Sequence, residues 1–278
     1  MVNCVSLNRH LLAKVRTRKP FTIIFSLSRC GSTSIYRTLN LHRACKLVYE
    51  PDFSKHNVAE FLDTHKNLRE NYTGMKHVWD PSGFPFRADH RSMLKDIEKN
   101  CETWISMNEA LLSSADQKII FLTRKDEKSR IVSDLFGQAT EVWGPEPNAI
   151  HSAKVDSEYQ EKVTASKNIT LPIDVLHWYI NNIPRINSRL RDAAASNTVL
   201  DIQYEQIFSA RKSIENRIDV FKNVLDFLEL NSNFYNINFK KVSKILAPSG
   251  KLNSQDTYKK ILNISEIKKE IGWECPLL

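Results

Sequence analysis

The chain has 278 residues, of which 41% are hydrophobic and 26% are charged, as in a soluble globular protein and unlike a disordered or fibrous one. Its 40 Lys and Arg residues outnumber the 32 Asp and Glu residues, which gives a formal net charge of +8. This balance favours anionic partners such as nucleotides, nucleic acid or acidic glycans, although a soluble protein can carry a basic surface without any such partner.

The five cysteines are odd in number and widely spaced, and they form no Cys-x2-Cys pair. This pattern argues against a disulfide framework or a cysteine metal site and favours a reducing compartment. No apolar core of a signal peptide precedes Phe21, and no run approaches the ~18 apolar residues of a membrane span. We therefore expect a cytoplasmic protein without a metal site or a membrane span.

Residues 21–41 predict a strand, a turn of small residues and a helix. Residues 21–25 form an apolar, β-branched run, as in a buried strand. Residues 31–34 (Gly-Ser-Thr-Ser) form the turn, and a helical pattern starts at Ile35. This order of elements points backbone N–H groups and a helix N-terminus at a phosphate.

The turn departs from the usual loop of nucleoside-triphosphate enzymes, Gly-x4-Gly-Lys-Ser/Thr. Gly31 is present, but Ser26 stands in place of the first glycine and Ser32 in place of the lysine. The cation lies inside the loop instead, at Arg29. The loop therefore predicts a phosphate-bearing ligand but not the usual Mg–triphosphate arrangement.

Polar residues also mark the second and third predicted strands, at 46–49 and 75–79. Glu50 follows the second strand, where it could act as a general base beside the loop or lie in solvent before Pro51. Lys76 and His77 are adjacent in the third strand. Because side chains alternate along a strand, at most one of this pair faces the site.

A second anion site is predicted after the strand at 118–123. Arg124 ends this strand, and Ser133 lies two turns into the helix predicted from Asp126. An arginine fork with a hydroxyl donor suits a terminal phosphate. Arginines at strand ends are often merely solvated, so the prediction depends on the loop at Arg29. Two anion sites imply a ligand with two separated phosphates.

Strands and helices alternate along the chain, which predicts an α/β protein with a mostly parallel central sheet and helices on both faces. Ligands of such sheets bind at the carboxyl ends of the strands. The remaining strand is expected at 198–202, and helices near 33–41, 56–70, 89–114, 126–140, 172–195 and 213–230.

Two segments lack this alternation. Residues 144–171 predict a long loop or lid, and the Lys- and Asn-rich part from about 236 to 278 shows little regularity before a short helix near 265–271. We see no internal repeat and no linker. The chain is therefore expected to form one domain, with a core of about 21–230.

Taken in order, these motifs resemble sulfotransferases that use 3′-phosphoadenosine 5′-phosphosulfate (PAPS), most of all the trehalose 2-sulfotransferase type. The loop at 29–34 is similar to the family's 5′-phosphosulfate loop, and Arg124 with Ser133 to its 3′-phosphate site. Weaker similarities follow at 74–80, at 138–143 and at 204–207. The resemblance covers about 21–230 and implies the P-loop-like, three-layer α/β/α fold of these enzymes.

The resemblance also implies the chemistry. A hydroxyl of an acceptor, a carbohydrate or glycolipid, attacks the sulfur of PAPS, and the 3′,5′-bisphosphate (PAP) leaves without help from a metal. Glu50 takes the hydroxyl proton, with His77 as the reserve base, and Arg29 with the loop amides stabilises the developing charge. The residues implied to bind the nucleotide are Arg29, Cys30, Gly31, Ser32, Thr33, Ser34, Arg124, Ser133 and, from the C-terminal part, Lys251, which could equally lie in a surface turn.

The chain departs from the family's pattern at several positions. Cys30 replaces the usual Ser or Thr, Ser28 replaces a frequent proline, and the interval from Arg124 to Ser133 is one residue longer than in cytosolic relatives. The segment at 144–171 and the C-terminal part match nothing in the pattern. These departures leave the acceptor less defined than the donor.

Two other functions remain open. A P-loop kinase-type phosphotransferase would share the fold, but it needs the missing lysine and a Mg-binding aspartate, for which Asp80 and Asp201 are candidates. A non-catalytic module that binds nucleic acid or glycans would use the net charge, but the chain lacks a stripe of alternating basic and aromatic residues. We therefore expect a small-molecule or glycan acceptor, no nucleic acid, and an oligomeric state that the sequence does not define.

Overall fold

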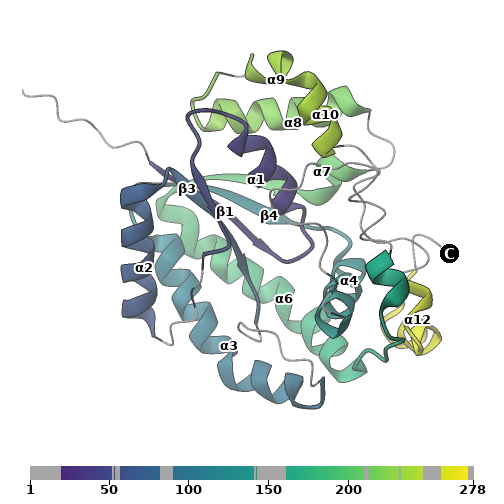
Figure 1. Ribbon diagram of the computed structural model, residues 1–278. Helices are drawn as coiled ribbons and strands as arrows, with labels where there is room; N and C mark the ends of the chain where they lie inside the picture. The colour runs from purple at the N-terminus through teal and green to yellow at the C-terminus, as the bar shows by residue number, and fades with distance from the viewer. Residues whose placement is uncertain are drawn as a thin grey trace, which may run out of the picture.

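The computed structural model describes residues 20–51, 53, 57–81, 90–140, 142, 161–209, 213–231, 233–246 and 258–274. Five parallel strands form a central sheet in the order β2-β3-β1-β4-β5 (Figure 1). The strands are β1 (Phe21–Leu27), β2 (Leu47–Tyr49), β3 (Gly74–Trp79), β4 (Gln117–Thr123) and β5 (Thr198–Gln203). This sheet confirms the predicted α/β class and its parallel strands.

Helices pack on both faces of the sheet and give three layers (Figure 1). One group consists of α1 (Ser32–Asn40), α7 (Tyr204–Phe208), α8 (Ile214–Phe227), α9 (Phe234–Ile237) and α10 (Phe239–Leu246). The opposite group consists of α2 (Val58–Asn71), α3 (His90–Ser113) and α6 (Ile173–Ala193). Two further helices, α4 (Glu127–Thr140) and α12 (Ile264–Ile271), pack against α6.

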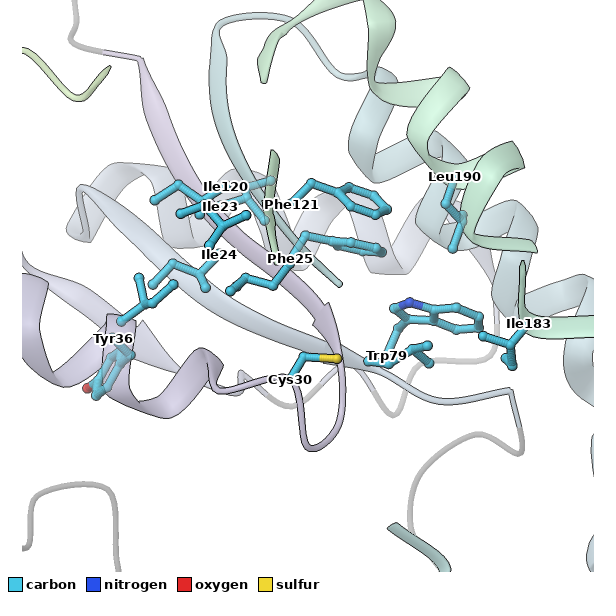
Figure 2. Packing of buried hydrophobic residues seen from close by; sticks show 14 of the residues in the cluster. Ile23, Ile24, Phe25, Cys30, Tyr36, Trp79, Ile120, Phe121, Ile183 and Leu190 are labelled. Atoms are coloured by element: carbon cyan, nitrogen blue, oxygen red, sulfur yellow. The ribbon is translucent and has the colours of Figure 1, made fainter. Parts of the chain in front are cut away.

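The central strand β1 is buried along its whole length. Its register places Phe25 opposite His77 of β3 and Phe121 of β4. The rings of Phe25 and Phe121 lie 5.3 Å apart, on the side where Figure 2 shows Leu190 of α6. A strand covered on both faces needs an apolar run without polar alternation, which is the pattern at its position in the sequence.

The connections between strands define where a ligand can bind. The chain leaves β1 into α1 on one face and leaves the neighbouring β3 toward α3 on the other. Such a reversal between adjacent strands is the topological switch point at which open α/β sheets bind ligands, beyond the carboxyl ends of the strands. The loop after Leu27 lies at this point.

The predicted strands and helices are found within a few residues of their expected bounds, but the expectation for the C-terminal part was partly wrong. α9 and α10 occupy a stretch that we expected to be irregular. Residues 161–165, inside the expected loop, are helical, and Ile169 forms a parallel β-bridge with Ile261. Residues 166–171 are not helical, as expected, and 144–160 lie outside the described residues. None of the described helices is both long and apolar enough to cross a membrane.

Candidate functional site

The loop between β1 and α1 contains two residues with left-handed backbone. Arg29 has a φ of 64° and Gly31 a φ of 82°. The left-handed region costs a non-glycine residue about 1–2 kcal/mol, so the conformation of Arg29 is held by its surroundings. At Gly31 an added Cβ would lie 2.6 Å from Cε2 of Phe208, so this position requires glycine for both its φ and its space.

The N-terminus of α1 opens toward the same edge of the sheet. Among the described residues no side chain caps this helix, and its first turn contains no acidic residue. The amides of Ser32 and Thr33 begin the helix, and the amide of Ser34 donates to the carbonyl of Gly31 at 3.1 Å. An uncapped helix start presents N–H donors and the positive end of the helix dipole to an anion.

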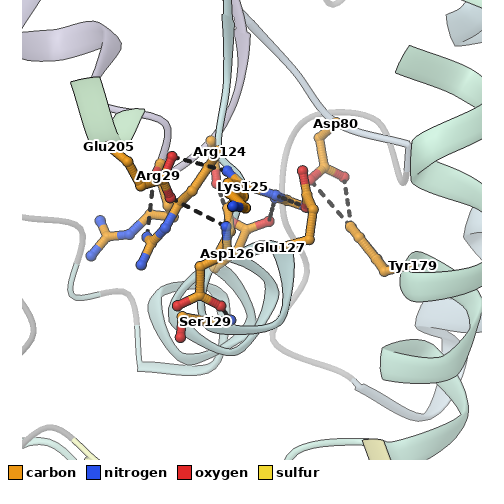
Figure 3. A network of polar contacts seen from close by, with 12 residues as sticks. Arg29, Asp80, Arg124, Lys125, Asp126, Glu127, Ser129, Tyr179 and Glu205 are labelled. Atoms are coloured by element: carbon orange, nitrogen blue, oxygen red, sulfur yellow. Dashed lines mark hydrogen bonds and ion pairs between the residues drawn. The ribbon is translucent and has the colours of Figure 1, made fainter. Parts of the chain in front are cut away.

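The structure brings the two predicted anion sites into direct contact. Nε of Arg29 donates to Oγ of Ser133 at 2.8 Å, and Nη1 of Arg124 lies 3.4 Å from the carbonyl oxygen of Arg29. Figure 3 shows Arg29 and Arg124 side by side beyond the N-terminal end of α4. Ser133 is buried, with 2% of its surface exposed, and its hydroxyl is the group that contacts Arg29.

Arg124 has an unsatisfied donor. Its guanidinium lies over the ring of Tyr204, 4.6 Å from the centroid. Its Nε is buried, and among the described residues it has no hydrogen-bond partner. A buried N–H without a partner costs about 1–3 kcal/mol. The residue as a whole is only partly buried, so other atoms of its guanidinium can meet an anion.

A buried group of charges lies behind the loop, on α4. Ser28 donates to Asp134, Arg130 donates to Glu127 at 2.6 Å, and Nη1 of Arg130 lies 3.7 Å from Oδ2 of Asp134. Arg130 and Asp134 have no exposed surface. Burial raises the pKa of Asp134, although the positive charge of Arg130 acts against this. Neither Arg130 nor Asp134 belongs to a motif recognised in the sequence, although their i, i+4 spacing on a predicted helix is a signal for such a pair.

The side chain of Cys30 does not face the site. It is 1% exposed, and burial raises the pKa of its thiol to about 12. The thiol therefore stays protonated at neutral pH and is no nucleophile. Within the loop, Cys30 offers the ligand its backbone alone.

Glu50 follows β2 and forms an ion pair with Lys76 of β3. Lys76 is buried and lies over the ring of Tyr49, 4.1 Å from the centroid, while the Glu50 side chain is 36% exposed. Glu50 has a φ of 37°, a second left-handed residue at the end of a strand. β3 lies between β2 and β1, so Glu50 and Arg29 follow strands that are not adjacent.

His77 lies in the hydrophobic core. Its ring contacts those of Phe25, Phe53 and Phe61, and its Nε2 is 2.7 Å from Oδ1 of Asn108. Burial lowers its pKa to about 4, so the imidazole is neutral at physiological pH. Lys76 and His77 face opposite sides of the sheet, as strand alternation predicts. The reserve base is therefore enclosed by aromatic rings.

The two aspartates considered for magnesium have other partners. Asp80, at the end of β3, is buried and accepts from the hydroxyl of Tyr179 at 3.3 Å (Figure 3). Asp201 pairs with Arg191 at 2.8 Å. Within the described part of the chain, no three His, Cys, Asp or Glu residues are grouped as metal ligands. Lys251 and residue 143 lie outside the described residues.

Other hollows lie away from this edge. A groove of about 500 Å³ runs between α3 and α6 past Trp178 and Arg185, and a hollow of about 320 Å³ lies beside His65 and Arg69 of α2. Neither is lined by the residues of the loop.

Comparison with known proteins does not assign the chain to a family. Scans against protein-family models, curated proteins and solved structures found no match for the chain.

Proposed function

We propose that the protein is a sulfotransferase that moves a sulfuryl group from PAPS to an acceptor hydroxyl, on a carbohydrate or glycolipid. The observation that carries the proposal is the cluster of Arg29, Arg124 and Ser133 beside the uncapped start of α1. Two arginines, a hydroxyl and helix amides at a topological switch point suit a nucleotide with two anionic ends. That the α/β fold is the one of PAPS-dependent sulfotransferases is part of the same proposal.

The residues present fit such a donor. Arg124 is partly exposed, and its guanidinium could donate to a 3′-phosphate. The hydroxyl of Ser133 accepts from Arg29, and a hydroxyl can also donate, so this contact is compatible with a phosphate oxygen. Arg29 and the amides of Ser32 and Thr33 would bind the phosphosulfate end. The bound donor supplies the sulfuryl group that is transferred.

In the proposed reaction the acceptor oxygen forms a bond to sulfur while the bond between sulfur and the 5′-phosphate oxygen breaks. Arg29 and the loop amides stabilise the negative charge that grows on the leaving phosphate, and one such donor is typically worth about 2.7–4 kcal/mol of the barrier. Glu50 is the proposed acceptor of the hydroxyl proton. Its pairing with Lys76 orients the carboxylate and leaves part of it exposed.

Calorimetric titration with 3′,5′-adenosine bisphosphate, with Mg-ATP as a parallel ligand, tests the donor. We expect micromolar binding of the bisphosphate that does not depend on Mg²⁺. Arg124→Ala should weaken it about tenfold or more, since a hydrogen bond to a charged group contributes about 1.5–3 kcal/mol. Arg191→Ala, which removes an arginine of α6 that pairs with Asp201 of β5, is the matched control.

The other outcomes are equally informative. A preference for Mg-ATP would favour a phosphotransferase, and binding of neither ligand would reject the proposal in favour of a non-catalytic binding module.

A further inference from the structure

The short helix α7 touches both halves of the candidate site. Phe208, at its end, packs against the turn at Gly31, where an added Cβ would lie 2.6 Å from the ring. Tyr204, at its start, lies under the guanidinium of Arg124. The two rings are themselves 4.8 Å apart. α7 thus packs against the two loops that provide the anion-binding side chains.

Glu205 of α7 fixes the backbone that follows Arg124. Its Oε2 accepts the amide of Lys125 at 3.0 Å, and its Oε1 accepts the amide of Asp126 at 3.2 Å (Figure 3). These two consecutive amides immediately precede α4, so a carboxylate there is also favoured by the helix dipole. Each carboxylate oxygen accepts a hydrogen bond from one of the two amides, and this pair of bonds fixes the orientation of the turn.

Tyr204 fixes the side chain of the same arginine. An arginine that stacks on an aromatic ring has its guanidinium plane set by that ring. With the plane set, Nη1 points to the carbonyl oxygen of Arg29, and Nε is left buried without a partner among the described residues. The backbone and the side chain of Arg124 are therefore positioned by two neighbouring residues, Tyr204 and Glu205.

We propose that Tyr204 and Glu205 are positioning residues that make the site selective for nucleotides with a 3′-phosphate. They do so by fixing the backbone and the guanidinium of Arg124 beside Arg29, where the partly exposed side chain would bind that phosphate. The inference rests on the proposed function, because it assigns the 3′-phosphate to Arg124. A purely structural role predicts a different result, because loss of Glu205 would then lower the affinity for every nucleotide by the same factor.

The test compares two ligands, 3′,5′-adenosine bisphosphate and adenosine 5′-phosphate, by calorimetry on the full chain. In Glu205→Gln one amide would face the NH₂ group of the glutamine, so the turn after Arg124 loses a partner. We expect affinity for the bisphosphate to fall about tenfold, the equivalent of one charged hydrogen bond, and affinity for the monophosphate to change less than about twofold. Glu215→Gln, an exposed carboxylate in the first turn of α8, is the matched control.

A second pair of variants does not depend on the folding of Glu205→Gln. Tyr204→Leu should reduce the preference for the bisphosphate in the same way, and Tyr204→Phe, which keeps the aromatic face, should retain it. Equal weakening of both ligands, or an unchanged preference in both Glu205→Gln and Tyr204→Leu, would overturn the inference. If the wild-type protein itself shows no preference for the bisphosphate, the proposed function is rejected and this inference with it.

Discussion

At the scale of single residues, the candidate site contains strained backbone. Among the described residues, four non-glycine residues have positive φ: Arg29, Glu50, Asp116 and Glu229. Arg29 is the second residue after β1, and Glu50 is the first residue after β2. Strain of about 1–3 kcal/mol persists only where surrounding contacts impose it, and it is concentrated at functional sites.

Gly31 and Gly272 provide a test of how tightly the loop is packed. Both have left-handed φ, but a Cβ at Gly272 would meet nothing closer than Nζ of Lys128 at 3.5 Å. Gly31→Ala should therefore lower the free energy of unfolding by about 2–4 kcal/mol, from strain plus overpacking, and Gly272→Ala by about 1 kcal/mol. Urea denaturation of the two variants measures the difference. Equal losses would mean that Phe208 moves away and does not confine the loop.

At the scale of elements, α4 contacts the β1–α1 loop on one side and the C-terminal part of the chain on the other. The contacts Arg29–Ser133 and Ser28–Asp134 join the β1–α1 loop to this helix. On its other side, the C-terminal part of the chain packs against its first turn. Nε1 of Trp273 donates to Oγ of Ser129 at 2.9 Å, and Nζ of Lys128 donates to the carbonyl of Gly272 at 2.9 Å.

Trp273 should therefore contribute strongly to stability. It is 3% exposed and stacks edge-on with Tyr258 at 5.3 Å. Trp273→Ala should lower the free energy of unfolding by about 3–5 kcal/mol. Trp178→Ala, at a partly exposed tryptophan of α6, should cost about 1–2 kcal/mol because less apolar surface is lost. Similar losses in the two variants, measured by urea denaturation, would show that the C-terminal contact is not a strong one.

At the scale of the whole molecule, buried neutral histidines couple the stability of the fold to pH. Burial lowers the pKa of His77 to about 4, against 6.5 for the ordinary imidazole. Above pH 6.5 both the folded and the unfolded states are neutral at this position. As the pH falls below 6.5, the unfolded chain takes up the proton first, so stability decreases until about pH 4. His65, whose pKa burial also lowers to about 4, acts in the same direction.

Denaturation between pH 7 and pH 4 tests this coupling. His77 should account for a loss of the order of 3 kcal/mol over this range. In His77→Gln, which keeps a donor for Asn108, the stability should fall less steeply with acid; the remaining slope then comes from His65 and from carboxylates. His177→Gln, at an imidazole that is 42% exposed, is the control. An unchanged pH dependence in His77→Gln would show that this histidine is not a source of the effect.

The sequence alone determined most of the strands and helices, because these depend on local pattern. The phosphate-binding role of the loop remains a prediction. A short window of sequence is enough to recognise the apolar runs of β1 and β4 and the turn of small residues around Gly31. α10 was missed because its apolar residues Val242, Ile245 and Leu246 lie in a Lys- and Asn-rich stretch, although they share one face of a helix. The sulfotransferase function remains a prediction from these motifs.

Only the tertiary structure decided which of the candidate residues meet. The order of the strands places β4 beside β1, so Ser133 contacts Arg29 across 104 positions of the chain. The same order inserts β3 between β2 and β1, which pairs Glu50 with Lys76 of the intervening strand. Strand order depends on how whole faces of the sheet bury their apolar surface, and no short segment of sequence contains that information.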